Sequence, residues 1–238
     1  LDFYKNRKLQ YIFNTEDSLY ILDRLGRNVE NFPMKLSAKA KRGHSLLDYD
    51  KNRKYRILVP SENGMVYNYT KEGKVVKGWK FEKMNMPISH QLQYVNIKGK
   101  DYIYVVDSNG NTNVVGRNGK KRMDIGKIPI KSSYYIDKKD GSIYTSDNSG
   151  NIWLTTLQGS LTKIKTSELA SFSFYASNFN NDDLMDLFIS DDSGVKCYNL
   201  ESEILDFNIQ NESDPKVFKF NNQSIIGFSS GGSCYLFD

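Results

Sequence analysis

The chain has 238 residues, of which 39% are hydrophobic and 26% are charged, and its mean hydropathy is −0.58. Its longest apolar runs are about five residues, far short of the roughly 20 that a membrane-spanning helix needs, so no transmembrane segment is expected. Residues 1–127 carry 25 Lys and Arg against 13 Asp and Glu, whereas residues 128–238 carry 8 against 15. This asymmetry can steer an anionic partner, although lysines in turns are ordinarily only solvated.

The same phrase occurs twice near the start of the chain. "LDFYKNRKLQYIF" begins at Leu1 and "LDYDKNRKYRILV" begins at Leu47, with six of the 13 positions identical. The apolar run that closes the phrase returns about every 40 to 46 residues, starting at Tyr11, Ile57, Tyr102, Ser142, Asp186 and Ser224. A period of this length is typical of solenoid and propeller architectures.

Each copy reads as short strands joined by tight turns, because its apolar runs are rich in Tyr, Val, Ile and Phe and are bounded by Asn, Gly, Asp and Ser. We name the strands A to D. Strand A precedes the B–C hairpin; "HSLL" from His44 is an example. In the first five copies a turn such as "TKEGK" leads from strand C into strand D, which in one copy reads "VVKGWKF".

Four strands per repeat predict a β-propeller. We expect an all-β chain of about six four-stranded blades, with five to seven possible, forming one domain over residues 1–238. The chain starts at the end of an A strand, stops inside a C strand and lacks an initiating Met. We therefore expect it to be a fragment of a longer protein.

The two cysteines fall at equivalent positions on the C strands of neighbouring copies, Cys197 in "VKCYNL" and Cys234 in "GSCYLF". Strands in different blades should hold the two Cα atoms farther apart than the roughly 7 Å that a disulfide allows. We expect two buried free thiols.

Two phrases, "DYDKNRKYRILV" and "NFNNDDLMDLFISD", resemble FG-GAP or VCBS propeller repeats, whose A–B loop reads D-x-[DN]-x-D-G-x-x-D before an apolar strand. The stretch "GMVYNYTKEGKVVKGW" is similar to the continuation found in those repeats and in PQQ-like propellers. The resemblance covers most of the chain. It implies a secreted, periplasmic or outer-membrane-associated propeller that binds partners.

In the FG-GAP family this loop can hold calcium, because oxygen ligands at positions 1, 3, 5 and 9 converge on a hard cation. The residues that match these positions are Asn178, Asn180, Asp182 and Asp186. The match is incomplete, since Asn at the first position removes a charge and Asp183 replaces the turn glycine. A second copy offers Asp48, Asp50 and Asn52 but has Arg56 at the ninth position. The alternative, which we favour, is that these side chains only cap the turn, so no cofactor is expected.

The B–C turns "SDNSGNIW" from Ser146 and "SDDSGVKC" from Ser190 resemble the Asp box of sialidases, S-x-D-x-G-x-x-W. The first has Asn148 in place of the Asp and the second has Cys197 in place of the Trp. In those enzymes the box is a structural hairpin remote from catalysis, so we interpret both turns as hairpin chemistry.

One set of polar residues shares a position in the repeat. His44 and His90 are 46 residues apart, and Lys131 occupies the same register in the next copy. Propeller geometry puts these D–A entries on the face of the B–C turns, around the channel mouth. The predicted ligand-binding ring comprises His44, His90, Lys131, Glu62, Asn63, Asn109, Asn148 and Asp192. Such a ring suits an anion, a sugar or a peptide; the alternative is that the histidines only bond to backbone at a strand start.

Two functions remain. The first is a non-catalytic propeller scaffold that binds a protein or glycan partner at the channel mouth. The alternative is a carbohydrate-active enzyme, a glycoside hydrolase or lyase, which needs two carboxylates about 5 to 10 Å apart. The scarcity of Asp and Glu on inner strands favours the scaffold. Nucleic acid is not expected, since the basic residues are not interleaved with aromatics on one recognisable module.

Overall fold

The computed structural model describes residues 1–40, 42–166, 172–180, 182, 184–191, 194–199, 203–206, 216–220, 223–230 and 233–237. These residues form strands and turns. Within those ranges there is no helix, and therefore no helix that could cross a membrane. The chain divides into two compact units, Leu1–Ile128 and Pro129–Asp238. The prediction of one continuous domain stays a prediction.

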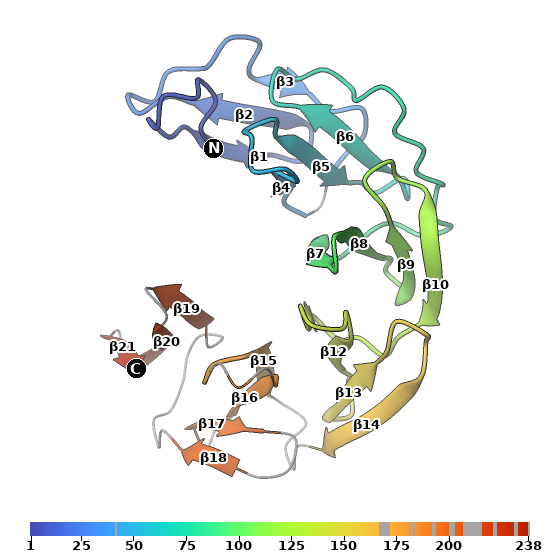
Figure 1. Cartoon of the computed structure of the whole chain (residues 1–238), viewed down its shortest axis with the longest axis vertical. Coiled ribbons are helices and arrows are strands. Elements are labelled where there is room, and N and C mark those ends of the chain that lie inside the picture. The colour runs from blue at the N-terminus through green and yellow to red at the C-terminus, as the bar shows by residue number, and fades with distance from the viewer. Residues whose placement is uncertain are drawn as a thin grey trace. The chain divides into compact units, whose positions relative to one another are not determined.

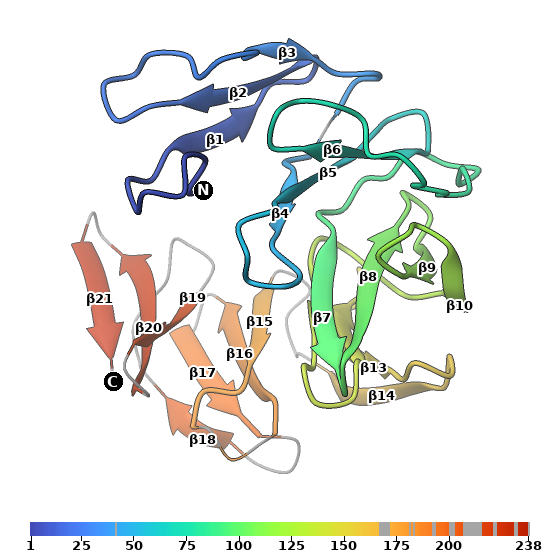
Figure 2. The ribbon, with the colours of Figure 1, turned by 45° about the horizontal axis from the view of Figure 1, so that its top comes forward.

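The first unit contains three antiparallel sheets, which Figures 1 and 2 show as separate groups of strands. Their strands, in sheet order, are β1 (Tyr11–Asn14), β2 (Ser18–Leu22) and β3 (Met34–Lys35); β4 (Ser45–Leu47), β5 (Arg56–Pro60) and β6 (Val66–Thr70); and β7 (Gln93–Ile97), β8 (Lys100–Val106), β9 (Asn111–Val115) and β10 (Lys121–Lys127). The last sheet has all four strands of the predicted repeat, with β7 to β10 as strands A to D.

The second unit also contains three antiparallel sheets. Their strands are β11 (Tyr134–Ile136), β12 (Ile143–Ser146), β13 (Asn151–Thr155) and β14 (Leu161–Thr166); β15 (Ser173–Ser177), β16 (Asp186–Asp191), β17 (Gly194–Tyr198) and β18 (Glu203–Asp206); and β19 (Lys216–Phe220), β20 (Gln223–Ser230) and β21 (Ser233–Phe237). Each predicted B–C hairpin is present, so the all-β prediction is confirmed.

The fourth strand expected at "VVKGWKF" is absent. In the described structure, residues 75–81 make one isolated bridge to this sheet, between Val75 and Tyr69. Gly78 then takes a left-handed conformation, with φ 82°, which turns the chain away from the sheet. The indole of Trp79 donates a hydrogen bond to the carbonyl of Val66 at 2.7 Å. A side chain therefore bonds to β6, where the backbone of a fourth strand was expected to pair.

Within each unit, the hydrophobic core consists of thin layers between successive sheets. On β5, Ile57 and Val59 pack into the cluster shared with the β1–β3 sheet, whereas Leu58 packs into the cluster shared with the β7–β10 sheet. On β16, Leu187 likewise faces one cluster and Phe188 the other. Alternate side chains of a strand point to opposite faces, so these central strands are buried on both sides.

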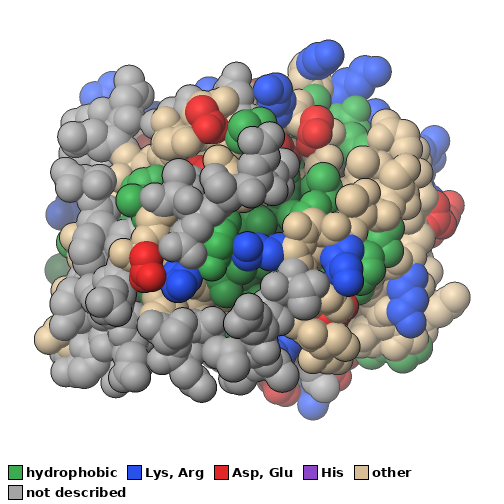
Figure 3. Space-filling view, turned by 90° about the horizontal axis from the view of Figure 1, so that it is seen from below, with side chains coloured by type: hydrophobic (Ala, Val, Ile, Leu, Met, Phe, Trp, Pro, Cys, Tyr) green, Lys and Arg blue, Asp and Glu red, His purple; other side chains and the backbone are tan. Residues whose placement is uncertain are grey.

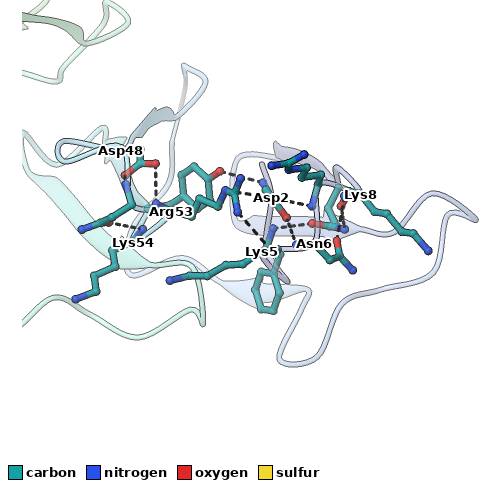
Figure 4. A network of polar contacts seen from close by, with 12 residues as sticks. Asp2, Lys5, Asn6, Lys8, Asp48, Arg53 and Lys54 are labelled. Atoms are coloured by element: carbon teal, nitrogen blue, oxygen red, sulfur yellow. Dashed lines mark hydrogen bonds and ion pairs between the residues drawn. The ribbon is translucent and has the colours of Figure 1, made fainter.

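The duplicated phrase forms two loops with the same internal hydrogen bonds (Figure 4). In the β4–β5 loop, the Asp48 carboxylate accepts hydrogen bonds from the backbone N–H of Asn52 at 3.1 Å and of Arg53 at 2.8 Å. In the loop before β1, Asp2 accepts the two equivalent bonds. Arg53 joins the copies through an ion pair with Asp2, Nε to Oδ2 at 3.2 Å. The sequence repeat is therefore a structural repeat.

Both cysteines are free thiols on the third strands of successive sheets. Cys197 on β17 is buried, and burial raises the pKa of its thiol to about 12. Cys234, in contrast, is exposed, so the predicted burial is wrong for this residue. Cys234 lies on β21, the edge strand of its sheet, where no further strand of that sheet pairs with it.

Candidate functional site

The antiparallel order of the strands gives every sheet two different ends. The B–C turns and the segments that enter strand A lie at one end, which we call the B–C end, and the A–B and C–D turns lie at the other. In the first unit, the segments that connect one sheet to the next bond to B–C turns. The backbone hydrogen bonds that join them, with the donor named first, are Leu36 to Asp17 (2.7 Å), Glu62 to Lys39 (2.9 Å), Ile88 to Ser61 (3.3 Å) and Ser108 to Pro87 (2.9 Å).

The strand registers place His44, His90 and Lys131 at the B–C ends of their own sheets. β4 begins opposite Leu58, and β7 begins opposite Tyr104, so the histidines that precede these strands lie beside the following turns. The backbone N–H of Lys131 donates to the carbonyl of Ser146, the last residue of β12, at 2.7 Å. Both histidines belong to the first unit and Lys131 to the second, so their convergence in one ring stays a prediction.

The side chain of Asn14 on β1 fixes the orientation of His44. Asn14 Oδ1 accepts the backbone N–H of His44 at 3.1 Å and lies 3.0 Å from its Nδ1, while Asn14 Nδ2 donates to the carbonyl of Thr15 at 2.9 Å. Since an amide oxygen only accepts, Nδ1 carries the proton and Nε2 is left as an acceptor. Burial lowers the pKa of His44, so the ring is neutral at neutral pH.

The segments that carry the two histidines are tied together. Arg42 Nε donates to the carbonyl of Ser89 at 2.5 Å, and Ser45 Oγ donates to the carbonyl of Leu92 at 3.0 Å. These four residues flank His44 and His90 in the sequence. Both histidines are half-buried, so neither is lost inside the core.

The predicted turn residues differ in how far their side chains are engaged. Asn63 Nδ2 donates to the Tyr67 hydroxyl at 2.9 Å and Asn63 Oδ1 accepts the backbone N–H of Met65 at 3.1 Å, so this side chain stabilises its own turn. Asn109 and Asn148 are exposed at turn tips. Glu62 is half-buried and Lys131 is exposed, with its Nζ 5.6 Å from the centroid of the Phe172 ring. Asp192 lies outside the described residues.

Two aspartates that sequence reasoning missed hold the B–C turns. Asp107 accepts hydrogen bonds from the backbone N–H of Asn109 and from both the backbone and the side chain of Asn111. Asp147 accepts the equivalent bonds from Ser149 and Asn151. The two turns share the spacing D-x-x-G-N, which could have identified both aspartates.

Asp147 also accepts a hydrogen bond from Trp153 Nε1 at 2.8 Å. The Asp-box alignment placed Asn148 at the aspartate position; the structure shows that the aspartate one residue earlier binds the tryptophan. Burial alone raises the pKa of Asp147, but the bonds from Asn151, Trp153 and backbone N–H groups outweigh it and lower the pKa to about 2. This carboxylate is a turn cap rather than a proton donor at neutral pH.

A polar cavity of about 280 Å³ lies in the first unit between β9, β10 and the segment before β7. It is lined by Lys83, Met84, Asn85, Asp107, Asn111, Asn113, Lys121 and Asp124. Lys121 and Asp124 form an ion pair at 3.2 Å, and Asp107 is engaged in its turn. No sequence feature predicted this cavity, because its residues come from segments about 40 positions apart.

The loop predicted as a possible calcium site is stabilised mainly by hydrogen bonds within the turn. Asp186 Oδ2 accepts the backbone N–H of Phe179 at 2.7 Å. Asp182 accepts from Asn180 Nδ2 and from the backbone of Leu184, both at 2.8 Å. Asn178 Oδ1 suits a cation, since it is buried without a hydrogen-bond partner in the described part of the chain, and Asp186 Oδ1 is buried as well. Asp183 lies outside the described residues. The predicted turn capping accounts for most of the oxygens, and calcium binding stays untested.

The surface charge follows the sequence asymmetry, because the division between the compact units falls where the charge changes sign. On the face drawn in Figure 3, Lys and Arg side chains are spread over the described surface with Asp and Glu side chains among them, and several Lys and Arg side chains gather at the upper right.

Taken together, the repeated antiparallel sheets and the layers between them define the fold of a β-propeller, and the comparisons agree. No family model and no curated protein matches the chain. BBS1N, solved in complex with ARL6DN, is similar with a TM-score of 0.68 at 13% identity, over 99% of this chain and 74% of that chain.

Two bacterial structures are also similar. BamB from Moraxella catarrhalis gives a TM-score of 0.60 at 13% identity, over 95% of this chain and 66% of that one. A protein of unknown function from Bacteroides caccae gives 0.55 at 14% identity, over 92% and 82%. At these identities the likeness shows the fold alone.

Proposed function

We propose that this chain is a non-catalytic β-propeller that binds a protein partner through the B–C ends of its sheets, in the cell envelope or outside the cell. Similar propellers support a binding role, since BBS1N was solved with ARL6DN bound. The BamB likeness is compatible with a periplasmic or outer-membrane-associated protein. A glycan in place of a protein partner is the second ligand to test.

The observation that carries this proposal is the pair of tied segments at the B–C end of the first unit. The segments that carry His44 and His90 are joined by the Arg42–Ser89 and Ser45–Leu92 hydrogen bonds, and His44 is held by Asn14 with Nε2 as an acceptor. A preorganised polar surface loses little conformational entropy on binding. It therefore suits recognition of a partner's N–H or O–H groups.

The alternative, a carbohydrate-active enzyme, requires a carboxylate that can exchange a proton or attack a sugar. Two described carboxylates of the B–C turns, Asp107 and Asp147, do not suit this role. Each accepts several N–H bonds within its own turn, and for Asp147 these bonds lower the pKa of the carboxyl. Both are therefore better suited to holding the turns than to catalysis.

The test distinguishes the role of the His44 ring in binding from the role of its hydrogen bond to Asn14. His44→Asn keeps a donor near the position of Nδ1 for Asn14 but removes Nε2, whereas Asn14→Ala removes the link. We expect His44→Asn combined with His90→Asn to raise the dissociation constant for the protein partner by at least about ten-fold, which corresponds to the loss of roughly one hydrogen bond. The unfolding free energy should change by no more than about 1 kcal/mol.

The enzyme alternative is tested in the same preparation with common glycan substrates. The proposal predicts no turnover. Turnover that is abolished by Glu62→Gln, with folding unchanged, would replace the scaffold by an enzyme. Binding that survives the double histidine variant would exclude these residues from the site without excluding a partner.

A further inference from the structure

The A–B and C–D turns of the first unit, at the ends of the sheets opposite the B–C turns, are strongly basic. We call this surface the basic end. Its cations are Lys5, Arg7 and Lys8 before β1; Arg24 and Arg27 after β2; Lys51, Arg53 and Lys54 between β4 and β5; Lys71 and Lys74 after β6; Lys98 before β8 and Lys100 at its start; and Arg117 and Lys120 between β9 and β10. The three sheets thus repeat the same charge at the same turns.

Carboxylates at the basic end neutralise only part of this charge. They are Asp2, Asp23, Asp48, Asp50, Glu72 and Asp101. Asp48 binds backbone N–H groups, and the others pair with Arg27, Arg53, Lys71 or Arg117. The remaining ten cations form no ion pair within the described part of the chain, and all ten are exposed.

Contacts between neighbouring sheets make the basic end one continuous surface. The Lys71 Nζ lies 4.1 Å from the centroid of the Phe3 ring. Arg117 Nη1 pairs with Asp50 at 2.6 Å, and Arg53 pairs with Asp2. Figure 4 shows the Lys8 and Lys54 side chains pointing away from this network, so their charges are presented outward.

Exposed apolar side chains lie among these cations. Leu25 is 76% exposed between Arg24 and Arg27, and Val75 is 61% exposed next to Lys74. Tyr4 and Leu9, which flank the first basic loop, are 54% and 63% exposed. Contact with another surface would remove the apolar area of these side chains from water.

We propose that the basic end binds an anionic lipid membrane peripherally. Lys and Arg near such a surface contribute about 1 kcal/mol each, and aliphatic or aromatic tips enter the boundary between headgroups and acyl chains. The charges sit on the tips of turns from three sheets, which suits an extended, flat surface. This inference is independent of the partner-binding proposal, because it uses the opposite ends of the same sheets.

A nucleic acid or an acidic protein is the competing polyanion. Single-stranded nucleic acid binds to rows of stacking aromatic side chains, whereas three of the exposed apolar side chains here, Leu9, Leu25 and Val75, are aliphatic. An acidic peptide in a groove would not need Leu25 and Val75 to be exposed beside the charges. Both competitors are outcomes of the experiment.

The experiment is flotation of the purified chain with vesicles of phosphatidylcholine alone or mixed with an equal amount of phosphatidylglycerol. The test variant combines Lys8→Glu, Lys54→Glu and Lys100→Glu, one from each sheet. The matched control reverses Lys35, Lys83 and Lys127 to Glu; all three are exposed, and they lie towards the B–C ends of the same sheets. Both variants therefore have the same net charge.

We expect binding only to the anionic vesicles. The test variant should weaken it by about 100-fold, since each lost cation near the surface accounts for about five-fold, whereas the control should stay within about five-fold of the wild type. Leu25→Ser with Val75→Ser should weaken binding by about ten-fold without changing its salt dependence. Equal effects of the test and control variants, or binding to RNA or polyglutamate but not to vesicles, would overturn the proposal.

Discussion

The β12–β13 turn depends on the Asp147 carboxylate, and the substitution Asp147→Asn probes it with almost no change in volume. Both the Asn151 side chain and the Trp153 indole donate to Asp147 Oδ2, each at 2.8 Å. In the variant, one oxygen becomes an NH₂ group. An amide that keeps its oxygen towards the backbone N–H groups of Ser149 and Asn151 presents a donor to two donors.

The loss of unfolding free energy in Asp147→Asn can be calculated in two ways. Hydrogen bonds to a charged acceptor contribute about 1.5–3 kcal/mol each, less where water can replace them. Independently, lowering a pKa from 3.8 to about 2 corresponds to at most about 2.4 kcal/mol, and about half of that after solvent screening of this partly exposed group. We therefore expect Asp147→Asn to reduce the unfolding free energy by about 2 kcal/mol.

The assay is urea unfolding followed by tryptophan fluorescence in a Trp79→Phe background, which leaves Trp153 as the only tryptophan. The control is Asp140→Asn, because the Asp140 carboxylate accepts a hydrogen bond from the backbone N–H of Ser142 that an amide oxygen can still accept. The control should change the unfolding free energy by less than about 0.5 kcal/mol. Equal values for the two variants would refute the role of Asp147.

The stabilisation by Asp147 should also depend on pH. Because the folded-state pKa of Asp147 is lowered, its contribution is present above the unfolded-state pKa and is lost as the pH falls towards the folded-state value. The difference in stability between wild type and Asp147→Asn should therefore shrink between about pH 4 and pH 2. A difference that stays constant over this range would show that the loss is not electrostatic.

Three further predictions concern other parts of the chain. Iodoacetamide should label the exposed Cys234 quickly and the buried Cys197 only on unfolding, since the reactive form is the thiolate; equal rates would contradict the assigned burial. EDTA should leave the melting temperature unchanged, because turn hydrogen bonds account for most oxygens of the loop at Asn178, and a drop of several degrees would establish calcium. Arg53→Ala should cost about 1 kcal/mol more stability than Arg7→Ala at the equivalent position, because only Arg53 pairs with the buried Asp2 in the described structure; equal losses would exclude that ion pair as a link between the copies.

The sequence predicted the strands well because the information is local. The apolar runs at Ile57 and Asp186 begin or cover β5 and β16, and alternation along five or six residues suffices to mark a strand with two buried faces. The missing fourth strand after β6 shows the limit. Whether "VVKGWKF" pairs with the sheet depends on the turn at Gly78 and on the Trp79 contact, which pattern alone does not contain.

The candidate site was only partly predictable, for the same physical reason. The repeat register correctly places His44 and His90 at the B–C ends of their sheets. It could not identify Asn14, which lies 30 residues before His44 and sets its tautomer, because this contact joins two sheets. The basic end was not predicted either, because its turns lie about 46 residues apart in the sequence and adjoin one another only in the folded structure.

The most direct test of the partner-binding claim is site-specific photo-crosslinking in the cells that produce the protein. A photoreactive residue is placed at Asn63 or Asn109, in B–C turns, or at Lys100 and Lys139, at the opposite ends of their sheets. We expect one protein partner to be crosslinked from both Asn63 and Asn109 and from neither Lys100 nor Lys139. The same partner captured only from Lys100 and Lys139 would contradict it.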